Sequence, residues 1–324
     1  MAEASLLLWT WSRHGHMDVR VPEPCQTSLP PCWFTAFPML NRGLLAVTRL
    51  ATTRAVVGWS ATPLATSAAV FGVANALGLG ISLATGSHLH LDLIGTGVFS
   101  IAALALRGQA QQQVSAICIS LWAVKLAGFL FYRALLMHKD ARLDEVLATT
   151  PGAFGFWFIS FAWGWLVSLP HALAAGVSAP VRPPFCWLDG VGIGIFAVGL
   201  LLETMADWQK WQFKKDPESR GKFCDVGVWR LSQHPNWLGN LVLWTGIVVL
   251  NSSTLAAAGP AYLLPSFVSP LFLLALFYGQ ASGAISNTVQ LTNAKHGHDP
   301  AYQEYLKTVP LLLPTPSSFL KLCR

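Results

Sequence analysis

The stretch GVWRLSQHPNWLGNLVLW, residues 227–244, places four polar side chains directly before an uninterrupted apolar run: Arg230, Gln233, His234 and Asn236. Pro235 suits the first turn of a helix, where its missing N–H costs nothing, and His234 would then be the cap residue. The unpaired N–H groups and the dipole at a helix start attract anions. We therefore interpret this stretch as the start of a membrane helix that forms part of a binding site.

The composition supports a membrane protein. Of the 324 residues, 53% are hydrophobic and only 11% are charged, whereas soluble domains carry about 25% charged residues. This is too little charge to cover a globular surface of this size, so lipid must cover part of it. The 14 Trp agree, because Trp favours the interface between lipid and water.

Seven apolar segments of about 20 residues are long enough to span a bilayer: 64–84, 87–106, 114–136, 153–175, 187–208, 236–257 and 261–282. The sequence thus predicts an all-α, polytopic membrane protein with about seven transmembrane helices. Seven spans gather most Lys and Arg on the side of the C-terminus, which the positive-inside rule makes cytosolic. Glycines in the first two segments predict close helix contacts there, at positions 72, 78, 80, 95 and 97.

Residues 1–55 form a leader, rich in Arg and Ser, that is either disordered or a targeting segment. Residues 56–324 form the membrane domain, with 187–314 as its cofactor-binding part. We expect the endoplasmic reticulum membrane, or an organelle membrane if the leader is a transit peptide. The six Cys contain no C-x-x-C pair, so no metal site is expected. The basic residues lie in loops and not on a helix interleaved with aromatic residues, so nucleic acid is not expected as a partner.

Polar residues form a stripe at the end of the fifth segment. Glu203, Asp207, Lys210, Trp211 and Lys214 follow i, i+3, i+4 spacing and share a helix face. Lysines that snorkel to the membrane surface would explain Lys210 and Lys214, but not a carboxylate inside the membrane, which is costly and functional by default.

Lys125 interrupts the third segment and requires a partner such as Glu203 or Asp92. The pair is either an internal ion pair that holds two helices together or a direct part of a site.

The helix start itself offers hydrogen-bonding and aromatic groups. Asn236 and Asn240 share a face, and Trp229 and Trp237 are placed to stack on a planar ring. With the basic loop 214–222 this makes a cationic, aromatic entrance suited to an anionic nucleotide. The alternative is a capped helix start with routine Trp anchors. Tyr302 and Tyr305 in the tail either close over a ligand or belong to an amphipathic surface helix.

The stretches DWQKWQFKKDP, RGKFCDVGVWRLSQHPNWLGN and DPAYQEYLKTVP resemble the steroid 5-alpha-reductase-like family, in a branch of unknown function (the DUF1295 type). The same region is similar to sterol C14-reductases and, more distantly, to isoprenylcysteine carboxyl methyltransferases. The resemblance runs from about Gln113 to Pro314. It implies a membrane reductase in which NADPH delivers hydride to an activated carbon–carbon double bond of a steroid, sterol or other lipid-like enone.

Carried over by position, the resemblance assigns Lys210 and Lys214 to the cofactor phosphates and Trp229 to the nicotinamide end. His234 and Asn236 match the His and Asn of an H-P-N motif, Tyr305 matches a tail Tyr that packs on the cofactor, and Glu203 matches a Glu of the preceding helix. The expected cofactor contacts are Lys210, Lys214, Trp229, His234, Asn236, Trp237, Asn240, Tyr302 and Tyr305. The proton donor is open between the membrane phenols Tyr132 and Tyr278, with Glu203 orienting the phenol.

Several departures from the family pattern leave alternatives open. The segment SNTVQLTNAK, residues 286–295, lacks the charged residues that are usual there, and His296 stands where Lys-Tyr-Gly or Lys-Trp-Gly is usual. Gln233 stands where Arg is usual, Trp237 replaces Tyr, and Asn240 replaces an acid. A methyltransferase that uses S-adenosylmethionine would fit the same helix start, although the lysine pair suits a phosphorylated dinucleotide better. A non-catalytic lipid-binding relative is the third hypothesis. A hydrophobic small molecule and the lipid bilayer are the expected partners in each case.

Overall fold

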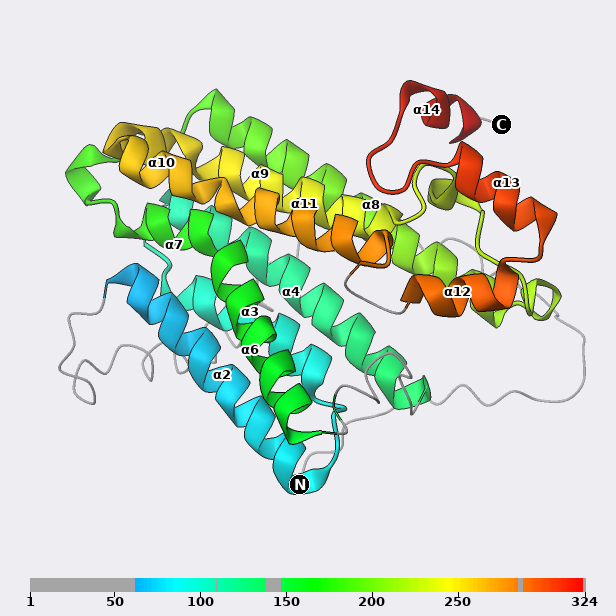
Figure 1. The fold of residues 1–324 in the computed structure, drawn as a ribbon. Helices are drawn as coiled ribbons and strands as arrows, with labels where there is room; N and C mark the ends of the chain where they lie inside the picture. The colour runs from blue at the N-terminus through cyan, green and yellow to red at the C-terminus, as the bar shows by residue number, and fades with distance from the viewer. Residues whose placement is uncertain (1–61, 109, 138–146, 148, 285–287, 323–324) are drawn as a thin grey trace, which may run out of the picture. The chain divides into compact units, whose positions relative to one another are not determined.

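The computed structural model describes residues 62–108, 110–137, 147, 149–284 and 288–322, all within one compact unit, Ala55–Arg324. The predicted leader lies outside the described residues. The helices are α2 (Pro63–Thr85), α3 (Leu91–Ala105), α4 (Ala110–Met137), α6 (Thr150–Val167), α7 (Leu169–Gly176), α8 (Trp187–Lys215), α9 (Pro235–Ala258), α10 (Pro260–Ser266), α11 (Val268–Ala281), α12 (Thr288–His296), α13 (Pro300–Thr308) and α14 (Pro316–Leu322). Short 3-10 turns occupy Ala179–Val181, Pro217–Ser219 and Gly227–Arg230 (Figure 1). The described chain contains no strand, so the all-α prediction is confirmed for it.

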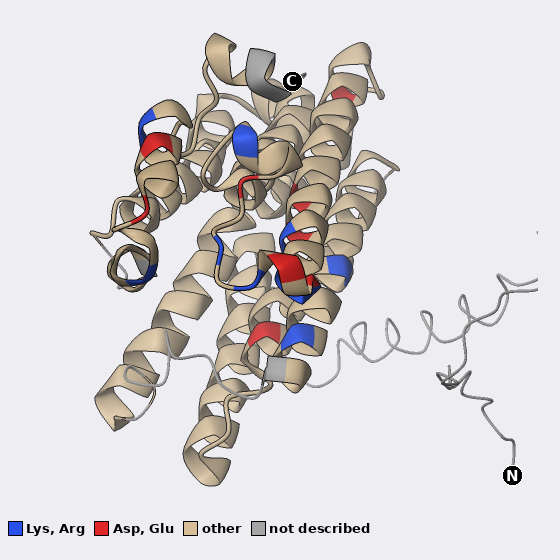
Figure 2. Ribbon diagram, turned by 90° about the vertical axis from the view of Figure 1, so that its right-hand side faces the viewer, with Lys and Arg blue, Asp and Glu red and all other residues tan. Residues whose placement is uncertain are grey.

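The helices support a polytopic membrane protein. Five are long and apolar enough to cross a membrane: α2, α4, α8, α9, and the continuous stretch of α10 and α11. The pair α6 and α7 makes a sixth candidate, bent by 52°. α3 has 15 residues and is about 22 Å long, which is short of a hydrocarbon core of about 30 Å. The long helices are almost entirely uncharged, and charged residues gather where α8 ends (Figure 2).

Proline explains the bend between α6 and α7. Pro170 occupies the second position of α7 and has no N–H to continue the hydrogen bonds of α6. Ser168 lies between the two helices and caps α6 through its own backbone N–H. The bend places the buried α7 residues beside α9, where Leu169, Leu173 and Leu255 pack in one small core.

α8 and α9 run side by side with their backbones in direct contact (Figure 1). A Cβ added to Gly199 would lie within 3.0 Å of the backbone of Leu243, and one added to Gly239 within 3.0 Å of the backbone of Glu203. Gly192 and Gly246 meet the partner backbone in the same way. Small residues permit such approaches in lipid. The contact fixes the position of Glu203 relative to the start of α9.

The predicted close contacts of the first two apolar segments have a different character. Gly78 faces the ring of Trp157, and Gly72 lies near the ring of Phe161, so side chains and not backbones meet there. A Cβ on Gly80 would meet nothing within 4 Å. The core between these helices and α9 is aromatic, with Phe99 against Phe71, Trp122 and Trp244. This packed core forms one wall of the candidate site.

Candidate functional site

A buried carboxylate is the centre of the candidate site. Glu203 on α8 is 3% exposed, and its Oε1 accepts hydrogen bonds from Trp122 Nε1 at 3.3 Å and Asn240 Nδ2 at 2.9 Å. Oε2 accepts from Lys125 Nζ at 3.1 Å. Three donors from α4 and α9 therefore compensate the removal of this carboxylate from water, as a buried charge requires.

Lys125 joins two carboxylates. Its Nζ lies 3.1 Å from Glu203 Oε2 and 3.4 Å from Asp207 Oδ2, and Asp207 is one turn further along α8. The prediction that Lys125 pairs with Glu203 or Asp92 is confirmed for Glu203. The Asp207 side chain is 13% exposed and that of Glu203 only 4%, so Asp207 is the more accessible acid of this charge cluster (Lys125, Glu203 and Asp207).

Asn240 carries an unsatisfied atom. Its Nδ2 must face the carboxylate, because a carboxylate only accepts hydrogen bonds. Its Oδ1 is buried and has no hydrogen-bond partner in the described chain. A buried acceptor without a partner costs about 1–3 kcal/mol. Asn240 thus neutralises no charge, but its amide group holds the Glu203 carboxylate in place.

The start of α9 has the predicted form. Pro235 is the first helical residue and His234 is the cap residue, with an extended φ of −135°. The backbone N–H of His234 donates to Ser232 Oγ at 3.1 Å. The interpretation of residues 227–244 as a helix start is therefore confirmed, and Asn240 links that start to the Glu203 stripe.

Two rings stack on Trp237. His234 stacks on it with ring centroids 4.2 Å apart and planes 7° apart, and Phe277 of α11 stacks at 5.6 Å and 10°. The His234 imidazole is half-buried, and this burial, together with the charge of Lys210, lowers its pKa to about 4. At neutral pH the ring is therefore uncharged, which suits stacking between apolar neighbours.

Trp229 is also enclosed. It is 3% exposed, and its Nε1 donates to Ala206 O at 3.0 Å. Lys210 Nζ lies 4.2 Å from the centre of its ring, a cation–π contact. Tyr305 Oη donates to Trp229 O at 2.9 Å, and burial raises the pKa of this phenol well above its ordinary value, so it remains a donor. The lysine, tryptophan and tail tyrosine that the sequence assigned to one site are in contact.

Gln233 attaches the tail to the helix start. Its Nε2 donates to Val309 O at 2.7 Å and to Leu306 O at 3.2 Å, and its backbone N–H donates to Pro310 O at 2.9 Å. Val309 is buried. Gln233 thus binds backbone carbonyls of the tail through both its side chain and its backbone.

Three further predicted site residues, Tyr302, Asn236 and Lys214, are not part of the charge cluster. Tyr302 is buried, donates to Asn293 Oδ1 at 3.4 Å, and packs with Phe223 and Tyr305. Asn236 is half-buried in the first turn of α9, and Lys214 is exposed in the last turn of α8.

The two phenols proposed as proton donors do not contact Glu203. Tyr132 is 51% exposed and lies about 10 Å beyond Lys125 along α4, with its ring against Trp211. Tyr278 is 59% exposed and follows the buried Phe277 on α11. The structure places Trp122, Asn240 and Lys125 around Glu203 instead.

A second buried polar cluster, which sequence reasoning missed, lies where α8 begins. Asp189 is fully buried, and its Oδ1 accepts from Gln111 Nε2 at 2.8 Å and Ser253 Oγ at 2.7 Å. Its Oδ2 accepts from the N–H of Cys186 and caps α8. Asp189 lies about 21 Å from Glu203 along the helix axis. The sequence feature that points to this cluster is the run of three glutamines at 111–113, which the predicted third segment, 114–136, does not include.

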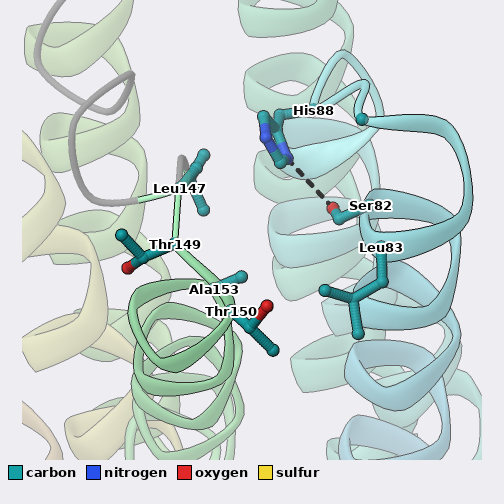
Figure 3. A pocket seen from close by; sticks show the side chains of 8 residues that line it. Ser82, Leu83, His88, Leu147, Thr149, Thr150 and Ala153 are labelled. Carbon is teal, nitrogen blue, oxygen red and sulfur yellow. Dashed lines mark hydrogen bonds between the residues drawn. The ribbon is translucent and has the colours of Figure 1, made fainter.

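Two cavities lie away from the charge cluster. One of about 330 Å³ lies between the end of α2 and the start of α6, and Figure 3 shows His88 Nδ1 beside Ser82 Oγ, 3.1 Å apart, on its wall. The other, of about 180 Å³, is lined by Ala110, Gln111, Arg182, Pro183, Pro184 and Phe185. No residue that the sequence assigned to the site lines either cavity.

Comparison with known proteins identifies one family. No curated protein and no solved structure matches the chain. The family described as Protein of unknown function (DUF1295) matches residues 79–309, which include the charge cluster, the start of α9 and the tail residues Tyr302 and Tyr305. This match covers more than two thirds of the sequence, and the chain belongs to the DUF1295 family.

Proposed function

We propose that the chain is a membrane-embedded reductase that uses NADPH to reduce a carbon–carbon double bond in a steroid, sterol or other lipid-like substrate. The observation that carries the proposal is the charge cluster of Lys125, Glu203 and Asp207, buried among apolar helices and about two to three turns from the basic end of α8. Ionisable groups inside a membrane domain are costly and mark functional sites. The kinship with steroid 5-alpha-reductases is part of the proposal and rests on the sequence resemblance.

The residues present fit the phosphates of NADPH better than its rings. Lys214, Arg220 and Lys222 are exposed at the end of α8 and in the loop after it. They offer charge-assisted hydrogen bonds to phosphate. His234 and Phe277 stack on Trp237, and Lys210 lies over the ring of Trp229. Binding of the nicotinamide end beside Trp229 therefore requires the tail held by Gln233 and Tyr305 to move.

NADPH supplies a hydride when bound, and the chain must then supply a proton to the other carbon of the double bond. Asp207 and Lys125 are the groups we propose for this step, in place of Tyr132 and Tyr278. They share a hydrogen bond, and Asp207 is the more exposed member of the charge cluster. Glu203, with three donors, holds Lys125 in position. The surrounding Trp122 and Trp244 exclude water.

The proposal includes the membrane topology. Seven spans with a cytosolic C-terminus would place the end of α8, the start of α9 and the tail at the cytosolic face, where NADPH is available. The endoplasmic reticulum is the proposed location.

A non-catalytic, lipid-binding role is the second candidate. Two observations favour it. His234 and Phe277 stack on Trp237, and the carboxylate of Glu203 accepts three hydrogen bonds from the protein. Both features are compatible with a site that has become structural.

Nucleotide binding to the purified full chain in lipid nanodiscs tests the proposal. NADPH is expected to bind more tightly than NADH or S-adenosylmethionine, and Lys214→Ala is expected to weaken NADPH binding about tenfold. Arg107→Ala, an exposed arginine after α3, is the matched control. Oxidation of NADPH with a panel of enones then separates the candidates: equal rates for the wild type and Asp207→Asn would reject catalysis at this cluster, and tighter binding of S-adenosylmethionine would reject the reductase.

A further inference from the structure

Arg182 lies at the opposite end of α8 from the charge cluster, in the loop between α7 and α8. Its Nε donates to Val177 O at 2.8 Å and its Nη2 to Ala175 O at 2.9 Å. Nη1 has no acceptor in the described chain, and no carboxylate of the described residues pairs with this guanidinium. Nε and Nη2 thus fix the side chain to the loop. The N–H groups of Nη1 and the positive charge of the guanidinium are not used by these bonds.

The surroundings make this arginine unusual. Burial lowers the pKa of Arg182 from its ordinary value, which shows that the charge is partly withdrawn from water without a counter-ion. The nearest carboxylate by sequence, Asp189, is fully buried and bonded to Gln111, Ser253 and Cys186. The guanidinium therefore has positive charge that nothing in the described chain neutralises.

Arg182 lines the cavity of about 180 Å³ together with Gln111 and the segment Pro183–Phe185. This volume is below the range of about 300–1,000 Å³ for sites that enclose a drug-sized ligand. It equals the volume of about six waters. A small anionic group fits this space, while the rest of a larger molecule would remain outside.

The chain on either side of Arg182 carries exposed apolar side chains. Phe185 is 52% exposed, Val181 43% and Trp187 78%. The loop connects helices that are candidates to span the membrane, and exposed aromatic residues at such a position belong to the interface between lipid and water. Phosphate groups of lipids lie at this level, and arginine binds phosphate through paired N–H groups.

We propose that Arg182 and the adjoining cavity form a phosphate-binding site, occupied by the phosphate of a phospholipid headgroup whose acyl chains pass over Phe185 and Trp187. The site does not rest on the proposed reductase activity, because it uses none of the residues of the charge cluster or of the start of α9. It lies on the side of the membrane that the sequence predicts to face away from the cytosol.

Native mass spectrometry of the delipidated full chain, titrated with phosphatidic acid or diacylglycerol, tests the proposal. The wild type is expected to retain phosphatidic acid about tenfold better than Arg182→Gln, and diacylglycerol equally poorly in both. Lys295→Gln, at an exposed position on α12, is the control for loss of one positive charge and is expected to bind like the wild type. Inorganic phosphate in a parallel titration distinguishes the sources: competition only at high concentration supports a lipid, and binding as tight as phosphatidic acid supports free phosphate.

Arg182→Lys separates recognition from support of the loop. It keeps the charge but loses the fork that holds Val177 and Ala175. Both variants lose the two hydrogen bonds to the loop, so a similar fall in melting temperature is expected of both. Binding of phosphatidic acid by Arg182→Lys that is intermediate between the wild type and Arg182→Gln then supports the site. The proposal is overturned if Arg182→Gln binds phosphatidic acid as the wild type does, if Lys295→Gln loses it equally, or if Arg182→Lys loses it as completely as Arg182→Gln.

Discussion

Lys125 Nζ lies 3.1 Å from Glu203 Oε2, although 78 residues separate the two in the chain. The pair joins α4 to α8 inside a domain of apolar helices, and Asp207 extends it by one turn. An ion pair of this kind is maintained only if both charges remain, because either charge alone would be buried without compensation.

Lys125→Met is therefore expected to lower the free energy of unfolding by about 3–5 kcal/mol, since two carboxylates lose their common cation. Lys125→Met combined with Glu203→Gln is expected to cost less than the single change, because one unpaired charge disappears with it. Unfolding in mixed micelles, followed by Trp fluorescence, measures both. Lys222→Met, at an exposed loop position, is the control. A loss no greater than that of the control would show that the pair does not stabilise the fold.

Gly239→Ala tests the contact between α8 and α9. The added methyl group would press on the backbone of Glu203, so the helices must separate and Asn240 must move from the carboxylate. A loss of about 1–3 kcal/mol is expected, as for other overpacked positions. Gly194→Ala is the matched control, because Gly194 is an exposed glycine of the partner helix α8 and a Cβ there meets nothing within 4 Å. That change should be neutral or stabilise by about 0.5–1 kcal/mol. Equal melting temperatures for the two variants would contradict the contact.

Local features of the sequence were sufficient to predict an all-α chain of apolar helices and the helix start at Pro235, because both depend on composition and on proline at the first turn. The count of seven spans is not reached in the described chain, where five helices, or six with the bent pair of α6 and α7, are long and apolar enough to cross a membrane. The pairing of Lys125 could also be narrowed to two acids, since a lysine inside an apolar segment must find one. The full ring stack could not be predicted, because Trp237 meets Phe277, which is 40 residues further along the chain on another helix. The Asp189 cluster could not be predicted for the same reason, because its partners Gln111 and Ser253 are 78 and 64 residues away in the chain.

The stack on Trp237 is expected to depend on pH. The pKa of His234 is lowered to about 4 from its ordinary value of 6.5. Between these values the unfolded chain binds a proton at this imidazole that the folded chain does not bind. The contribution of His234 is thus fully present above about pH 6.5 and is lost as the pH falls towards 4. Melting temperatures at pH 7.5 and 4.5 should differ more for the wild type than for His234→Gln. His298→Gln, at an exposed position, should behave as the wild type, and parallel falls in all three proteins would count against the assignment.

Gln233→Ala tests whether the tail controls access to the start of α9. The change removes the side-chain hydrogen bonds to Leu306 and Val309, each worth about 0.5–1.5 kcal/mol, and leaves the backbone bond to Pro310. The tail should then open more often, which trypsin would report as faster cleavage after Lys307. If the nicotinamide end of NADPH binds beside Trp229, the same change should accelerate NADPH association, because less of the binding free energy is spent on lifting the tail. Gln212→Ala, at an exposed position near the end of α8, should alter neither rate. Faster cleavage without faster association would separate the two roles: Gln233 would hold the tail, but the nucleotide would not bind beneath it.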